Sequence, residues 1–138
     1  MRKLRRIAPL ALVVLLAACS EHKLGGEFEV NGQKTPVVSC RIGQDGADAW
    51  GEVANAAGFR VRIVERKLAV SANTTNTKSE TFVQILPPGA RQFADAKCQS
   101  KSTSSSTING RRSGSATLTN CVGPGGSVSG KFTYGQCG

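Results

Sequence analysis

The sequence has few of the side chains that enzymes use most. It contains one histidine, His22, and aromatic residues make up only 5% of the chain. General acid–base catalysis needs a base, a nucleophile and an orienting group within reach of one another. Asp45, Asp48 and Glu52 lie close in sequence, but they surround a predicted turn, where we expect water to solvate them. The sequence therefore predicts no enzymatic activity and no catalytic residue.

Other ligand classes are also poorly matched. Nucleic-acid binding favours a basic stripe interleaved with aromatic side chains, whereas the basic residues here are scattered. No two cysteines have the short spacing of a zinc site, and the only histidine lies in the expected tether. The glycines at 123, 125 and 126 are not followed by the Lys-Ser/Thr pair of a phosphate-binding loop. We expect no nucleic-acid partner, no metal and no cofactor.

The apolar run at residues 7–18 falls short of the roughly 20 residues that a membrane-spanning helix needs. It follows a basic head and ends in Ala17-Ala18-Cys19. A basic head, a short apolar segment and a small-small-Cys end are typical of a bacterial lipoprotein signal peptide. We therefore predict lipidation at Cys19, where acyl chains would hold the protein on a membrane.

This site divides the chain into a signal peptide (1–18), a lipidated N-terminus and tether (19–26) and a β domain (27–138). Four of the 18 basic residues lie in the signal, and all nine acidic residues follow it, so the part from Cys19 onward has a net charge of +5. A basic surface suits contact with anionic lipid or cell wall. We expect an exported protein on the outer face of the cell membrane or in the cell envelope.

The exported part is typical of a small β domain, because turn signals separate short alternating segments about every ten residues. Asn31-Gly32 and Asn109-Gly110 are strong hairpin signals. We expect a single small antiparallel β-sandwich or partly open barrel with at most one short helix. Residues 65–67 are predicted to turn the chain, 73–79 to form a loop, and 102–106 to be either a flexible loop or an exposed strand. The expected strands are 28–30, 36–42, 49–53, 58–64, 68–72, 81–86, 115–122 and 128–134.

Alternation predicts which side chains of these strands face the core. Val38, Cys40 and Ile42 share one face and are expected inside. In the segment 58–64, the apolar residues at 59, 61 and 63 are predicted to be buried. The alternating Arg60 and Arg62 are predicted to face water. Trp50 is expected to pack rather than to hold a ligand.

The cysteine count supports export. Five cysteines leave four when Cys19 carries lipid. Four cysteines in an exported domain indicate two disulfides, with three possible pairings.

These pieces together resemble the mycobacterial nineteen-kilodalton lipoprotein antigen family of actinobacterial surface lipoproteins. The resemblance covers most of the domain. It rests on Leu16-Ala17-Ala18-Cys19, Val30-Asn31-Gly32, Val37-Val38-Ser39-Cys40, Ala56-Ala57-Gly58-Phe59-Arg60-Val61, and Ser129-Gly130-Lys131-Phe132-Thr133-Tyr134 with Cys137.

The resemblance implies a membrane-anchored antigen without enzymatic activity, whose lipidated N-terminus host Toll-like receptors sense. It also implies that Cys40 and Cys137, which match the two family cysteines, are paired. Our hypothesis then joins Cys98 to Cys121, which flank the excursion around residues 109–110. The chain departs from the family in this extra pair and in lacking a Thr-rich glycosylated tether. Two alternatives are a carrier of a lipid or other small apolar envelope ligand and an inhibitor of an exported hydrolase.

Overall fold

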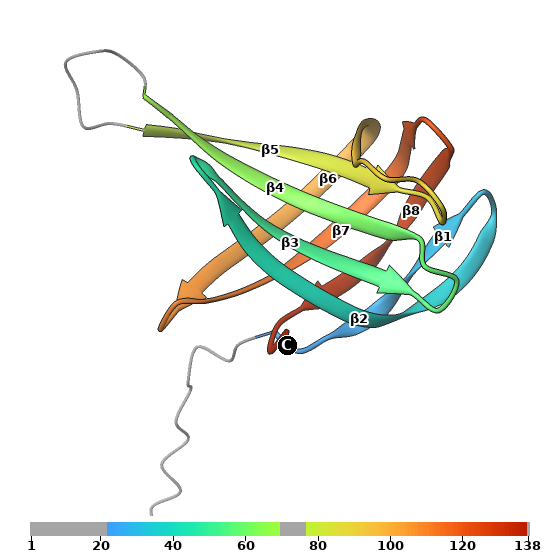
Figure 1. Ribbon diagram of the computed structural model, residues 1–138, viewed down its shortest axis with the longest axis horizontal. Coiled ribbons are helices and arrows are strands. Elements are labelled where there is room, and N and C mark those ends of the chain that lie inside the picture. The colour runs from blue at the N-terminus through green and yellow to red at the C-terminus, as the bar shows by residue number, and fades with distance from the viewer. Residues whose placement is uncertain (1–21, 70–76, 138) are drawn as a thin grey trace, which may run out of the picture.

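The computed structural model describes residues 22–69 and 77–137, which form a closed antiparallel β-barrel (Figure 1). Each strand pairs with the next one in sequence, and β8 returns to pair with β1. No helix occurs among these residues, so none long and apolar enough to cross a membrane is found there. The strands are β1 (Gly25–Val30), β2 (Gln33–Asp45), β3 (Asp48–Asn55), β4 (Arg60–Ala69), β5 (Thr77–Leu86), β6 (Ala94–Ile108), β7 (Arg111–Gly123) and β8 (Gly126–Tyr134).

The expected fold class is confirmed in its coarser form: the domain is all β, barrel-shaped and holds two disulfides. The barrel is closed, whereas we expected a sandwich or a partly open barrel. Closure depends on pairing between Gly25–Val30 and Val128–Thr133, which lie about 100 residues apart in sequence and leave no local signal. β1 begins at Gly25, so Gly25 and Gly26 belong to the barrel and not to the tether.

Because successive strands run in opposite directions, the barrel has two distinct ends. One end, which we call the mouth end, carries the start of β1, the end of β8 and the β2–β3 and β6–β7 turns. In Figure 1 the two turns lie at the left, and the start of β1 and the end of β8 lie at the lower centre. The other, the closed end, carries the β1–β2, β3–β4, β5–β6 and β7–β8 connections at the right. The two Asn-Gly turns lie at opposite ends, and all four of their residues have positive φ, as the sequence signal requires.

An apolar core fills the barrel from the closed end inward. Phe28 packs against Phe59 and Phe132, with ring centroids 6.1 and 6.3 Å apart. Burying a side chain of this kind contributes roughly 1.5–3 kcal/mol. The predicted inward residues Phe59, Val61 and Ile63 are all buried, which confirms the register of that strand. The remaining core residues are Val37, Val53, Val83, Ile85, Ala116, Leu118, Cys121, Val128 and Tyr134.

The barrel wall is uneven around its circumference. β6 and β7 pair along eleven residue pairs, whereas β5 and β6 pair only through Val83–Ile85 and Ala94–Ala96. Towards the mouth end these two strands no longer pair. There the Lys101 ammonium donates a hydrogen bond to the Thr81 carbonyl oxygen. The wall between β5 and β6 is therefore held at the mouth end by a side chain.

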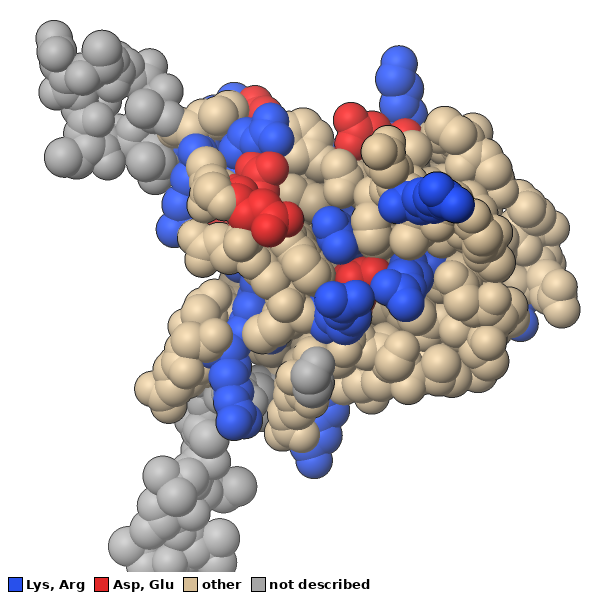
Figure 2. All heavy atoms as spheres, in the orientation of Figure 1, with Lys and Arg blue, Asp and Glu red and all other residues tan. Residues whose placement is uncertain are grey.

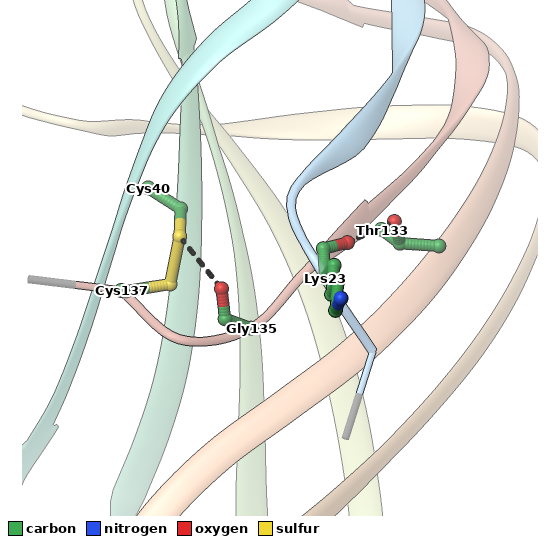
Figure 3. Close-up of a disulfide and its surroundings, with 5 residues drawn as sticks. All are labelled: Lys23, Cys40, Thr133, Gly135 and Cys137. Carbon is green, nitrogen blue, oxygen red and sulfur yellow. Dashed lines mark hydrogen bonds between the residues drawn. A yellow bond between two sulfur atoms is a disulfide. The ribbon is translucent and has the colours of Figure 1, made fainter. Parts of the chain in front are cut away.

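The disulfides join Cys40 to Cys137 and Cys98 to Cys121, the two pairs that our hypothesis named. Figure 3 shows the first of them beside the Gly135 carbonyl oxygen, which lies 3.7 Å from Cys40 Sγ. An oxidised sulfur carries no hydrogen, so this approach is a contact and not a donated hydrogen bond. Near it, the Thr133 hydroxyl donates to the Lys23 carbonyl oxygen. Both chain ends of the domain are thus fastened at the mouth end.

Several sequence expectations need correction. β4 continues through residues 65–67, where we predicted a turn, and residues 77–79 of the predicted loop belong to β5. A register shift between Val37 and Ser39 interrupts the pairing of β2 with β3. As a result Val37 faces inward, and Val38 is 51% exposed instead of buried. The Ser/Thr-rich segment 102–106 lies in β6, which agrees with the strand alternative. Residues 70–76 lie outside the described part. Of the predicted strand 68–72, only residues 68 and 69 are described, and they form the end of β4.

Candidate functional site

A polar cavity opens at the mouth end of the barrel. Its volume is about 340 Å³, and a second hollow of about 310 Å³ adjoins it and shares Gln44, Ala49, Thr107 and Arg112. Residues of five strands and of the β2–β3 turn meet there, which places the cavity inside the rim of the barrel. We call this cavity the mouth. It is lined by Gln44, Ala47, Ala49, Glu65, Lys67, Ser105, Ser106, Thr107 and Arg112.

Arg112 is the most deeply placed charged residue of the mouth. On β7 it continues the inward alternation of Gly114, Ala116 and Leu118, whereas its neighbour Arg111 points outward and is exposed. Arg112 is only 9% exposed. A guanidinium does not lose its proton in proteins, so burying it requires partners for its charge.

Glu65 and Ser105 supply those partners. Arg112 Nη2 donates to Glu65 Oε2 at 3.1 Å and to Ser105 Oγ at 2.9 Å, and Ser105 Oγ donates to Glu65 Oε2 at 2.9 Å. Burial raises the pKa of Glu65, but the hydrogen bonds from Ser105 and Arg112 outweigh it and hold that pKa below its ordinary value. The mouth therefore contains a charged pair whose two members come from β4 and β7, 47 residues apart.

Tyr134 forms the floor of the mouth. Its ring occupies the space that a side chain at Gly51 or Gly114 would fill, since a Cβ built there would lie 2.2 or 2.5 Å from Tyr134 atoms. The hydroxyl is buried beside Arg112, and burial raises the pKa of Tyr134. Neither the Tyr134 hydroxyl nor Arg112 Nε has a hydrogen-bond partner within the described residues. Both atoms are enclosed, and Tyr134 is not among the lining residues of the mouth, so the two groups face each other beneath it.

This arrangement suits the binding of an anionic group. A guanidinium presents donors in a planar fork that matches carboxylate and phosphate oxygens. Lys67 adds a second cation to the lining, against the single carboxylate of Glu65. The hydroxyls of Ser105 and Thr107 and the amide of Gln44 supply further donors. No histidine or thiol is among the lining residues.

A second polar cluster lies on the outside of the barrel wall. Glu52 points outward from β3 yet is only 2% exposed, and it pairs with Arg60 at 3.4 Å and Arg62 at 3.5 Å. The Arg62 guanidinium contacts the rings of Trp50 and Phe93, with its central carbon 3.9 Å from each ring centroid. Phe93 precedes β6, so these contacts hold the β5–β6 connection against the wall.

This outer cluster corrects two expectations. Glu52 is buried and paired, not solvated as we predicted, and Arg62 is covered although it points outward as expected. Trp50 packs, as predicted, and its indole nitrogen donates to Asp45 at 3.1 Å. A cavity of about 150 Å³ remains beside this cluster, but its charged side chains are largely committed to one another, as in the bidentate pair of Arg66 with Asp48. We regard the cluster as structural.

The predicted lipidation site, Cys19, lies outside the described residues, so its lipidation stays a prediction. His22 is described and exposed. Within 22–69 and 77–137, no three His, Cys, Asp or Glu side chains lie where they could hold a metal ion. Comparison of the chain with protein-family models, curated proteins and solved structures gives no match. The resemblance to the nineteen-kilodalton antigen family likewise stays a prediction.

Sequence reasoning missed the mouth entirely. Arg111 and Arg112 follow an Asn-Gly turn, and we counted them among the scattered basic residues. The available signal was the alternation that extends back from Leu118 through Gly114 to Arg112. Glu65 was missed because a run of three charged residues suggested a turn.

Proposed function

We propose that this protein is an exported, non-enzymatic lipoprotein of the cell envelope, anchored by lipid on Cys19, whose barrel binds a small ligand through an anionic group. The lipidated terminus would be the part that host Toll-like receptors sense. One observation carries the binding function: the guanidinium of Arg112 lines an open polar cavity together with the Lys67 ammonium and neutral donors. Two cations among hydroxyl and amide groups favour an anionic ligand.

The charges of the mouth favour an anion over the apolar ligand that we first considered. An apolar molecule would displace water from the Arg112 guanidinium and the Lys67 ammonium and would offer their N–H groups no acceptor. The deeper interior is filled by core side chains. A ligand with a phosphate or carboxylate supplies the acceptors instead. The hydrolase-inhibitor alternative has no comparable support among the described residues.

Removal of the acyl-bearing sulfur tests the anchor. We expect the Cys19→Ala protein to leave the membrane fraction, because the basis for anchoring is the small-small-Cys end of the signal. Membrane and soluble fractions are compared after a carbonate wash. If the variant stays in the washed membranes, the anchor lies elsewhere.

Inorganic phosphate tests the binding function. The lipidated protein in neutral detergent is melted with and without phosphate, with sodium chloride at equal ionic strength as the reference. A ligand that binds the folded state raises the melting midpoint. We expect this rise for the natural protein and for Glu65→Gln, which frees Arg112 for the anion, but not for Arg112→Gln.

Arg111→Gln is the matched control, because it removes the same charge one residue away on the outer face of β7. An equal loss of the phosphate effect in Arg111→Gln and Arg112→Gln would assign binding to general surface charge. No phosphate effect in the natural protein would refute the anion site.

A further inference from the structure

The mouth and the point where the chain enters the barrel lie at the same end. Gly25, the first residue of β1, pairs with Thr133, one residue before Tyr134 on the floor of the mouth. Just ahead of it, Lys23 is fastened to Thr133 by the hydrogen bond shown in Figure 3. The end of the barrel that receives the tether is therefore the end that opens into the cavity.

The tether is short. Only three residues separate Lys23 from Cys19, so a fully extended chain spans at most about 14 Å between them. This length is less than the roughly 25 Å end-to-end length of an eight-residue strand such as β3. A lipid on Cys19 would hold the mouth end close to the bilayer surface and the closed end away from it.

Charge at the mouth end agrees with that orientation. Figure 2 shows Lys and Arg side chains along much of the left side of the molecule, with a group of acidic side chains among them. Each basic residue close to an anionic membrane adds to the attraction between protein and bilayer. The exposed basic residues at this end are Lys23, Arg66, Lys67, Lys78, Lys101 and Arg111.

The size and the lining of the mouth suit a polar headgroup whose acyl chains remain in the bilayer. The mouth, at about 340 Å³, is large enough for a headgroup, and its polar lining does not suit an acyl chain.

We infer that the mouth faces the membrane and binds the phosphate of an anionic phospholipid headgroup from the bilayer that anchors the protein. This inference rests on the proposed function, since it names the source of the anion. Arg112 and Lys67 meet the phosphate oxygens. Because protein and lipid share one surface, the effective headgroup concentration at the mouth far exceeds that of the same anion in solution.

Hydrogen exchange on reconstituted protein tests this inference. The lipidated protein is placed in phosphatidylcholine vesicles, in vesicles that also contain phosphatidylglycerol, and in phosphatidylcholine vesicles with soluble glycerol phosphate at the same total concentration. Exchange is compared between the mouth segments 44–49 and 105–112 and the closed-end turns at 31–32 and 123–126. We expect phosphatidylglycerol to slow exchange in the mouth segments alone, by about tenfold for the amides nearest Arg112.

Charge variants separate a bound headgroup from general attraction. Arg112→Gln should abolish the slowing by phosphatidylglycerol, whereas Lys34→Gln, an exposed residue at the closed end, should leave it unchanged. Because Arg112→Gln leaves Glu65 without its cation, the double variant Glu65→Gln/Arg112→Gln is measured too. This double variant removes one charge of each sign and leaves the net charge of the mouth unchanged, and we expect it to fold and to show no lipid effect.

The alternative outcomes are distinct. Slowing at the closed end, or equally at both ends, would overturn the orientation. Equal slowing by soluble glycerol phosphate would make the ligand a free anion, which leaves the proposed function intact and refutes its lipid source. Slowing that survives in the double variant would refute a role for Arg112. An effect of neither lipid nor soluble phosphate would refute the proposed function as well.

Discussion

The two ends of this barrel use the same strand alternation for opposite purposes. At the closed end, inward positions carry Phe28, Phe59 and Val61, which exclude water and supply the stability of the fold. At the mouth end, the inward positions of β4 and β7 carry Glu65 and Arg112, which stabilise little because their pairing must offset desolvation. The same inward positions thus hold an apolar core at one end of the barrel and a charged pair at the other.

The largest difference between the two ends should appear when one charge is introduced into each. Val61→Asp buries a carboxylate in the apolar core, and we expect it to abolish folding, a loss of more than about 5 kcal/mol. Thr107→Asp places the same group in the mouth beside Arg112, where we expect a change of less than about 1 kcal/mol. Thermal melts of both variants compare the two ends. Similar losses would show that the mouth is as tightly packed as the core.

The boundary between the two regions can be tested at the floor. Gly51→Ala drives a methyl group into the Tyr134 ring, so we expect a loss of about 1–3 kcal/mol in unfolding free energy. Tyr134→Phe keeps the ring and removes the unpaired hydroxyl, and should be nearly neutral. Denaturant unfolding measures both changes. A neutral Gly51→Ala would mean that the floor can move.

How far the sequence predicts each region follows from the range of the interactions. The sequence predicts the Asn-Gly turns and the alternation around Val61 because both depend on neighbouring residues. It predicts two disulfides because their number follows from the cysteine count. Barrel closure depends on partners about 100 residues apart, and the register shift at Val38 lies within the β2–β3 hairpin but has no turn residue or break in alternation that predicts it. The mouth was hidden for the same reason as barrel closure, since Glu65 has its partner 47 residues away.

The outer wall gives a smaller effect that separates two arginines which look alike in the sequence. Arg62→Ser removes the contacts with Trp50 and Phe93 and leaves Glu52 buried with a weaker partner, so we expect a loss of about 1–3 kcal/mol. Arg60 is more exposed, and Arg60→Ser should cost about 0.5 kcal/mol or less. Urea unfolding of the two variants gives the difference. Equal losses would contradict the role of the aromatic contacts.

The smallest expected effect is the dependence of stability on acid pH at the mouth. The pKa of Glu65 is lowered in the folded protein from its ordinary value of 4.5 by hydrogen bonds from Ser105 and Arg112, which outweigh desolvation. A lowered folded pKa means that the unfolded chain binds the proton more readily, so this contribution is fully present above pH 4.5 and is lost as the pH falls through the folded pKa.

Asp48 has its pKa lowered by the hydrogen bond from Arg66 and contributes in the same pH window, so the natural protein alone cannot assign the loss to Glu65. Glu65→Gln keeps the shape and the Asp48 pair but removes this titration, and its melting temperature should fall less between pH 6 and pH 3 than that of the natural protein. Parallel curves for the two proteins would show that the pair of Glu65 with Arg112 does not stabilise the fold, and that Arg112 is held in the mouth by packing alone.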